Sequence, residues 1–114
     1  MPLAQAVECS RAVLVGELVG VTDAKLPDRS TWTLRVTEWV RPTSGPADVT
    51  YVVGGRRARL AGGGLGTLPP GQTGLFLVPA DKDEPIRAWT GLDQAAGRDK
   101  VDAALAKGWS GGCP

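Results

Sequence analysis

The sequence predicts a mainly β domain that closes as a small barrel of five strands, with one α-helix at its C-terminal end. Short apolar or alternating segments recur between turns, and the 16 glycines and 9 prolines supply those turns. Only residues 98–107 have the apolar spacing of an amphipathic helix. A chain of 114 residues fits a single domain, which we place at residues 9–114 after a loose leader at residues 1–8.

The first strand is expected at residues 11–21. Most of its residues are apolar or glycine, so both faces should be buried, and Gly16 and Gly20 mark bends or bulges. A bent strand with two apolar faces can serve two sheets, as the first strand of a small barrel does. Glu17 is the charged residue in the interior of this strand. We expect it to point outward at the Gly16 bend, because uncompensated burial is costly; the alternative is a buried carboxyl group with a raised pKa.

The second strand is expected at residues 31–40, where Trp32, Leu34 and Val36 alternate with polar residues. The alternation breaks where Trp39 is followed directly by Val40. Either Trp39 lies on the outer face of the strand, or a bulge turns it inward.

The remaining strands are expected at residues 48–53, 74–78 and 86–90. The glycine-rich run at residues 62–66 predicts a flexible or strained loop. In the helix at residues 98–107, the apolar residues lie three and four positions apart, and Gly108 is suited to follow its last turn. Trp109 is expected to pack back onto the domain.

The charge balance and the composition limit the classes of function. The chain has 13 basic and 12 acidic residues, whereas nucleic-acid and membrane-surface binding normally need a basic excess. It has no histidine, which is the commonest general base and metal ligand. No apolar run approaches the ~20 residues of a membrane span. We therefore expect no catalytic residues, no metal, no cofactor and no membrane span in this chain.

Cys9 and Cys113 bracket almost the whole chain and predict a disulfide. In the chain-entropy model, closing so long a loop contributes about 4–5 kcal/mol. Two free thiols are the alternative. A disulfide favours an oxidising, extracytoplasmic compartment, either secreted or at the cell surface. Ala4-Gln5-Ala6 has the small-x-small pattern found at the end of a secretory signal, although chance alanines explain it equally well.

The arginines at positions 56, 57 and 59 are the densest cluster of one charge. They could bind a phosphate, a carboxylate or an acidic partner. Alternatively, they form a solvated strand end that discourages edge pairing. Alternate residues of a strand share a face, so Arg57 and Arg59 are the better candidates for one binding surface.

Two tryptophans complete the candidate binding surface. Trp39 and Trp89 are expected at the surface, and aromatic and arginine side chains dominate the energetics of protein interfaces. Arg35, together with Trp39, is a partial match to the basic and aromatic strand residues of nucleic-acid-binding barrels.

Three segments carry a resemblance to a known superfamily: Cys9 with the apolar strand after it, residues 32–40, and the turn with its following strand at residues 70–77. The chain resembles the netrin-module and metalloproteinase-tissue-inhibitor superfamily, especially its small secreted bacterial members. The resemblance implies a five-stranded OB-like barrel, closed or partly open, a secreted setting and a role in protein interaction. Inhibitors of this kind bind zinc through an N-terminal cysteine, whereas Cys9 is internal, so the inhibitory mechanism is not carried over.

These observations favour a non-catalytic, extracytoplasmic protein-interaction module. Its partner would be another protein or a second copy of the chain. The alternatives are a nucleic-acid-binding OB-fold domain and a protease inhibitor of the netrin-module type.

Overall fold

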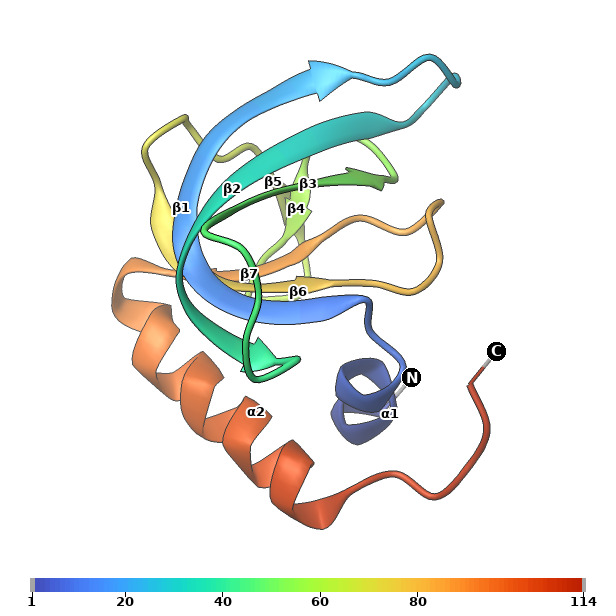
Figure 1. The fold of residues 1–114 in the computed structure, drawn as a ribbon, viewed down its shortest axis with the longest axis vertical. Helices are drawn as coiled ribbons and strands as arrows, with labels where there is room; N and C mark the ends of the chain where they lie inside the picture. The colour runs from blue at the N-terminus through green and yellow to red at the C-terminus, as the bar shows by residue number, and fades with distance from the viewer. Residues whose placement is uncertain (1, 114) are drawn as a thin grey trace.

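The computed structural model describes residues 2–113 and is mainly β (Figure 1). A curved sheet has one short helix at the N-terminal end and one longer helix at the C-terminal end of the described chain. In chain order, the elements are α1 (Leu3–Glu8), β1 (Ala12–Asp23), β2 (Ser30–Arg41), β3 (Asp48–Val53), β4 (Ala58–Arg59), β5 (Leu65–Gly66), β6 (Thr73–Val78), β7 (Arg87–Thr90), the 3-10 turn η1 (Gly91–Asp93) and α2 (Gln94–Lys107).

The strands form one mixed sheet of seven in the order β3-β2-β1-β6-β7-β4-β5. The predicted number of five strands is wrong, and of the two predicted forms, closed or partly open, the closed barrel is not found, because the sheet is not closed. The additional strands β4 and β5 have two residues each, β4 before the glycine-rich run and β5 at its end, so no alternation could reveal them. The five longer strands lie where the sequence predicted strands.

Arg11 connects parts of the sheet that the strand pairing leaves apart. Its guanidinium donates a hydrogen bond to the carbonyl of Val52 (2.6 Å) in β3 and one to the carbonyl of Pro79 (2.7 Å) after β6. The same group lies 5.8 Å from the centre of the Tyr51 ring. Gly54 N donates to Glu84 O (2.9 Å) nearby. Polar contacts thus hold this end of the curved sheet without a continuous strand ladder.

The pairing of β1 is irregular at both of its glycines, in agreement with the predicted bends or bulges. The pairing of β1 with β2 shifts register between Val15 and Gly16 and again between Leu18 and Gly20. A Cβ atom on Gly16 would overlap the carbonyl oxygen of Arg35, whereas nothing lies within 4 Å of such an atom on Gly20. Gly16 therefore allows close approach of two backbones, and Gly20 follows a bulge.

The register also resolves the position of Trp39. Val15 pairs with Glu38 and Gly16 pairs with Val36, so Thr37 is the extra residue of a bulge in β2. The bulge returns Trp39 to the side of Val36, where both pack against the same core. The inward alternative is therefore the one found.

Two apolar cores lie on opposite faces of the sheet. The concave face holds the larger core, with these fully buried large side chains: Leu14, Leu18, Trp32, Leu34, Val53, Phe76, Val78 and Ile86. The other face contributes Val13, Leu75, Leu77 and Trp89, which pack against Val7 of α1 and Val101 of α2. Because β1 alternates between the two cores, both of its faces are buried, as its composition predicts.

The N-terminal segment differs from the expected loose leader. Residues Leu3–Glu8 form α1, whose Ala4, Ala6 and Val7 are buried in the second core. Met1, also part of the predicted leader, lies outside the described residues, as does Pro114 at the end of the predicted domain. A helix of six residues without a side-chain cap is held by packing rather than by helix propensity.

The C-terminal helix is confirmed and begins earlier than predicted, at Gln94. Val101 and Ala104 are buried against the sheet, and Gly108 follows the helix with a φ of 72°. Trp109 packs back onto the second core, as expected. Among the described helices, none is long and apolar enough to span a membrane.

Candidate functional site

A cleft of about 650 Å³ lies between α1, the end of β6 and the segment that leads into β7. Its volume falls within the range of small-molecule and peptide sites, which is roughly 300–1,000 Å³. Apolar groups form much of its lining: Ala6, Leu77, Pro79, Ala80 and Pro85. Cys9, Arg59, Arg87, Asp81 and Glu84 complete the lining. The cleft therefore combines an apolar floor with charged groups at defined places.

Arg59 and Arg87 lie side by side in this cleft because β4 and β7 pair in parallel with these two residues as partners. Arg87 is also the pairing partner of Leu77, so the guanidinium lies beside the apolar floor. Both arginines are half-buried. Arg59 donates one hydrogen bond to the carbonyl of Gly63 (3.0 Å).

Neither arginine of the cleft is neutralised by a carboxylate within 4.0 Å among residues 2–113. Burial lowers the pKa of Arg87, the neighbouring Arg59 lowers it further, and Glu84 acts in the opposite direction. Two like charges therefore share a partly desolvated space. Holding them there has a free-energy cost that a bound anion would relieve.

The acidic residues lie at the exposed rim of the cleft. A side-chain oxygen of Asp81 accepts a hydrogen bond from the backbone N–H of Asp83 (2.8 Å), which orders the turn. Glu84 is the carboxylate that influences Arg87, although it does not form an ion pair with it. Positive charge thus lies inside the cleft and negative charge at its mouth.

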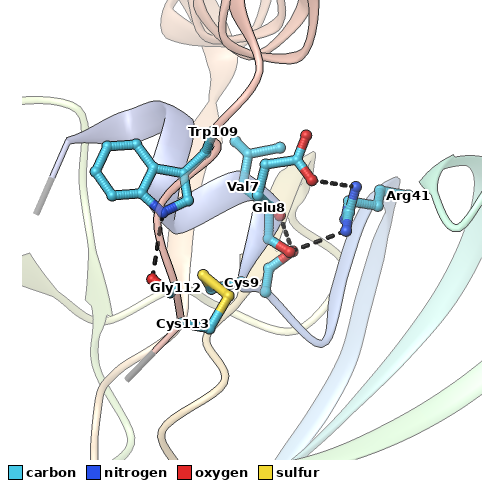
Figure 2. Close-up of a disulfide and its surroundings, with 8 residues drawn as sticks. Val7, Glu8, Cys9, Arg41, Trp109, Gly112 and Cys113 are labelled. Atoms are coloured by element: carbon cyan, nitrogen blue, oxygen red, sulfur yellow. Dashed lines mark hydrogen bonds and ion pairs between the residues drawn. A yellow bond between two sulfur atoms is a disulfide. The ribbon is translucent and has the colours of Figure 1, made fainter.

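The wall made by α1 is anchored at its C-terminal end (Figure 2). A disulfide joins Cys9 to Cys113 across a sequence separation of 104 residues, with a Cα–Cα distance of 5.5 Å. The predicted pairing is therefore present. Arg41 adds an ion pair to the Glu8 carboxylate (3.0 Å) and a hydrogen bond to its carbonyl (2.9 Å). A covalent bond and a strand residue together hold this wall against the sheet.

The residues predicted to bind do not form one surface. Arg57 is exposed, and Arg35 forms a long ion pair with Asp48 (3.4 Å). Trp39 is half-buried, and its indole N–H donates to the carbonyl of Pro46 (3.0 Å). Of the predicted binding residues, Arg59 is the one that lines the cleft.

The expectation that Trp89 is a surface residue is wrong. Its side chain is 8% exposed, because α2 covers that part of β7 and Gly97 packs directly against the indole. Arg87 lies on the same face of β7, beyond the cover of α2. Arg87 and Trp89 are two residues apart in one strand and so share a face, but which of them a helix covers is a tertiary property. Glu17 is partly exposed, so it is not the buried carboxyl of the alternative hypothesis.

No cluster of three or more potential metal ligands of the types His, Cys, Asp and Glu occurs within residues 2–113. Comparisons of the chain with protein-family models, with curated proteins and with solved structures find no match. The cleft and its arginine pair are therefore interpreted from their own geometry.

Proposed function

We propose that this protein is a non-catalytic binding module that acts outside the cytoplasm and binds a protein partner through the cleft beside α1. One observation carries the proposal: Arg59 and Arg87 lie together in an apolar cleft, and no carboxylate within residues 2–113 forms an ion pair with either. Arginine is enriched among the residues that dominate protein interfaces, and its planar group binds carboxylates with two hydrogen bonds.

The compartment is inferred from the disulfide. Cys9 and Cys113 are paired, and structural disulfides persist mainly where the surroundings are oxidising. The bond also fixes the wall of the cleft, so an oxidising compartment would keep the binding surface assembled. The resemblance to secreted netrin-module barrels agrees with this setting and stays a prediction.

The two alternative functions receive less support from the geometry. For nucleic-acid binding, Arg35 is engaged with Asp48, and Trp39 packs against the core instead of offering a free ring face. For inhibition of a metalloprotease, Cys9 would need a free amine, yet it follows α1 and is bonded to Cys113. No specific observation favours either alternative over the cleft.

The proposal can be tested by site-specific photo-crosslinking in cells that export the protein. A benzophenone amino acid replaces Ala80, which is exposed at the cleft, and the control carries it at Ala103 on the exposed side of α2. We expect a protein adduct from position 80 that is absent from position 103 and is lost when Arg87→Gln is added. The adduct is then identified, and the purified partner is titrated against the wild type and Arg87→Gln.

Support requires that the purified partner binds the wild type and that Arg87→Gln weakens the affinity by about ten-fold or more. An adduct with the protein itself, together with concentration-dependent sedimentation, would identify a second copy as the partner. Equal adducts from both positions, or a purified partner that binds Arg87→Gln as well as the wild type, would contradict the proposal.

A further inference from the structure

The geometry points to a free C-terminal carboxylate as the group that Arg59 and Arg87 bind, carried by an apolar chain end with a basic residue near it. The inference rests on the proposed function, since it names the chemistry of the same cleft. The occupant is the last few residues of a partner polypeptide.

The arginine pair selects an anion. The two guanidiniums are close enough for Arg59 to lower the pKa of Arg87, and the half-burial of both weakens screening by solvent. A single carboxylate between them could accept hydrogen bonds from both groups and remove their mutual repulsion. Arg59 donates from one nitrogen to Gly63, and its other side-chain donors form no hydrogen bond within residues 2–113, which leaves them for a ligand.

The floor and the rim select a carboxylate over a phosphate. The half-buried Pro79 and Pro85 and the exposed Ala80 offer apolar surface in the same cleft as the arginines, so the rest of the ligand should be apolar. Asp81 and Glu84 at the rim repel negative charge, and they repel a doubly charged phosphate more strongly than a singly charged carboxylate. A basic group on the ligand would turn the rim from repulsive to attractive.

The end of a chain fits these demands better than an internal acidic residue. At a C-terminus, the carboxylate and an apolar side chain belong to the same residue, which suits Arg87 and Pro85, two residues apart and both in the lining of the cleft. An internal Asp or Glu would bring polypeptide backbone on both sides. Its N–H and C=O groups would lose water against the apolar lining without finding partners.

The test uses the full-length, oxidised protein and matched synthetic peptides. The probe is acetyl-Lys-Leu-Leu with a free carboxylate, and its controls are the same peptide as the C-terminal amide, acetyl-Glu-Leu-Leu with a free carboxylate, and inorganic phosphate. Affinities are measured by calorimetry, and NMR follows the side-chain Nε–H signals of the arginines. We expect the free acid to bind and the amide to bind about ten-fold or more weakly.

Variants locate the binding. Arg59→Gln and Arg87→Gln should each weaken the free acid by about ten-fold or more, whereas Arg57→Gln, an exposed neighbour outside the cleft, should leave its affinity unchanged. Retention of the Cys9–Cys113 disulfide and of the thermal unfolding midpoint shows that each variant is folded. The lysine peptide should bind more tightly than the glutamate peptide because of Asp81 and Glu84.

The possible failures separate the inference from the proposed function. If acid and amide bind equally, if neither binds at about 10 mM, or if phosphate binds more tightly than the free acid, the inference is wrong. A partner crosslinked at position 80 that binds through an internal segment would also overturn it, while leaving the proposed function intact. Binding of the free acid without any protein adduct at position 80 would support the inference about the carboxylate and contradict the proposed function.

Discussion

At the scale of single residues, Gly16 and Gly20 of β1 have different physical reasons for being glycine. A side chain on Gly16 would overlap the backbone of Arg35, with Val36 Cα only 3.2 Å from the added atom. Around Gly20, nothing lies within 4 Å. Both glycines were predicted to mark bends or bulges, and the sequence alone could not separate the two roles because crowding by a neighbouring strand is not a local property.

We predict that Gly16→Ala lowers the free energy of unfolding by about 1–3 kcal/mol, because β2 must move to accommodate the methyl group. The matched substitution Gly20→Ala should be neutral or should raise it by about 0.5–1 kcal/mol, because an unstrained strand glycine costs entropy on folding. Chemical denaturation of the two variants beside the wild type measures both effects. Equal destabilisation by the two substitutions would show that bending, rather than crowding, demands both glycines.

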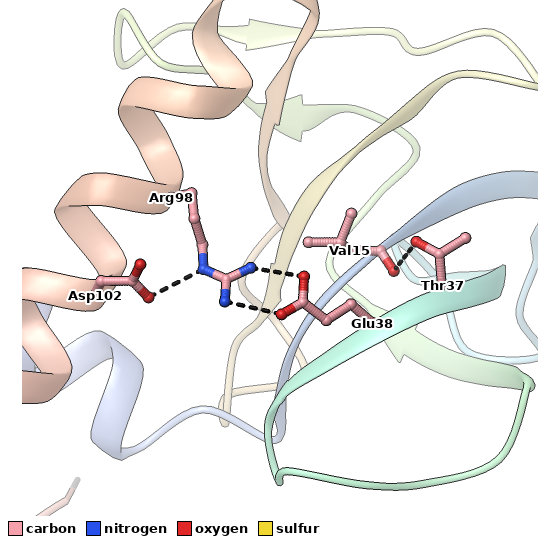
Figure 3. Close-up of polar contacts among 5 residues, drawn as sticks. All are labelled: Val15, Thr37, Glu38, Arg98 and Asp102. Carbon is pink, nitrogen blue, oxygen red and sulfur yellow. Dashed lines mark hydrogen bonds and ion pairs between the residues drawn. The ribbon is translucent and has the colours of Figure 1, made fainter.

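Glu38 of β2 makes a bidentate ion pair with Arg98 of α2, at 2.9 Å for each oxygen (Figure 3). Arg98 also donates to Asp102 (3.0 Å) one turn further along the helix. The hydrogen bonds from Arg98 hold the pKa of Glu38 below its ordinary value of 4.5. A carboxyl group whose pKa is lower in the folded state stabilises the fold above its unfolded pKa, and this contribution is lost as the pH falls through the folded pKa.

We predict that Glu38→Gln lowers the free energy of unfolding by about 0.5–1 kcal/mol at neutral pH, the range of a well-formed surface ion pair. The difference from the wild type should shrink below about pH 4.5 as the wild-type carboxyl group takes up its proton. The control is Glu17→Gln, since Glu17 forms no ion pair within residues 2–113. Denaturation series at several pH values give the measurement, and a difference independent of pH would contradict the assigned cause.

At the scale of secondary structure, most boundaries could be predicted because alternation and apolar runs are local signals. The range of β3 matches residue for residue, and β1, β2, β6, β7 and α2 differ from their predicted ranges only at the ends. The elements that the sequence did not predict are stabilised by contacts between distant segments or are too short to show a pattern. α1 gains its order from the second core, and β4 and β5 are too short to show a pattern.

The candidate site was less predictable than the fold for the same reason. Arg59 could be selected from its charge cluster, and the disulfide from the positions of its cysteines. Arg87 could not be selected, because its alternation matches that of Trp89 and the packing of α2 decides which of the two is covered. Gly97 is the residue that lets α2 approach the Trp89 indole so closely.

We predict that Gly97→Ala destabilises the protein by about 1–3 kcal/mol, although alanine is the better helix former by about 1 kcal/mol. The added methyl group would lie 2.5 Å from Trp89 Cδ1 and would force the helix away from the sheet. At the exposed position 103 of the same helix, the reverse change Ala103→Gly should cost about 1 kcal/mol through propensity alone. Thermal or chemical unfolding compares the two, and a stabilising Gly97→Ala would refute the close packing. Tryptophan fluorescence reports whether the Trp89 environment changes.

At the scale of the whole molecule, the Cys9–Cys113 bond joins the end of α1 to the tail after α2. Because it closes a loop of nearly the entire chain, the chain-entropy model assigns it about 4–5 kcal/mol, acting mainly by restricting the unfolded state. Three contacts hold α1 in place as the wall of the cleft: its buried face, the ion pair between Arg41 and Glu8, and this disulfide. Loss of the disulfide should therefore affect α1 and the cleft before it affects the curved sheet.

We predict that reduction of the disulfide lowers the free energy of unfolding by about 4–5 kcal/mol and speeds hydrogen exchange of the α1 amides more than those of β1. The double variant Cys9→Ser with Cys113→Ser should show the same loss and no further response to reductant, which separates the bond from other effects of the reagent. The same variant should bind a cleft ligand more weakly, because Ala6 and position 9 form one wall. If the reduced protein kept its stability and the protection of α1, packing alone would hold that wall, and the oxidising compartment would lose its structural argument.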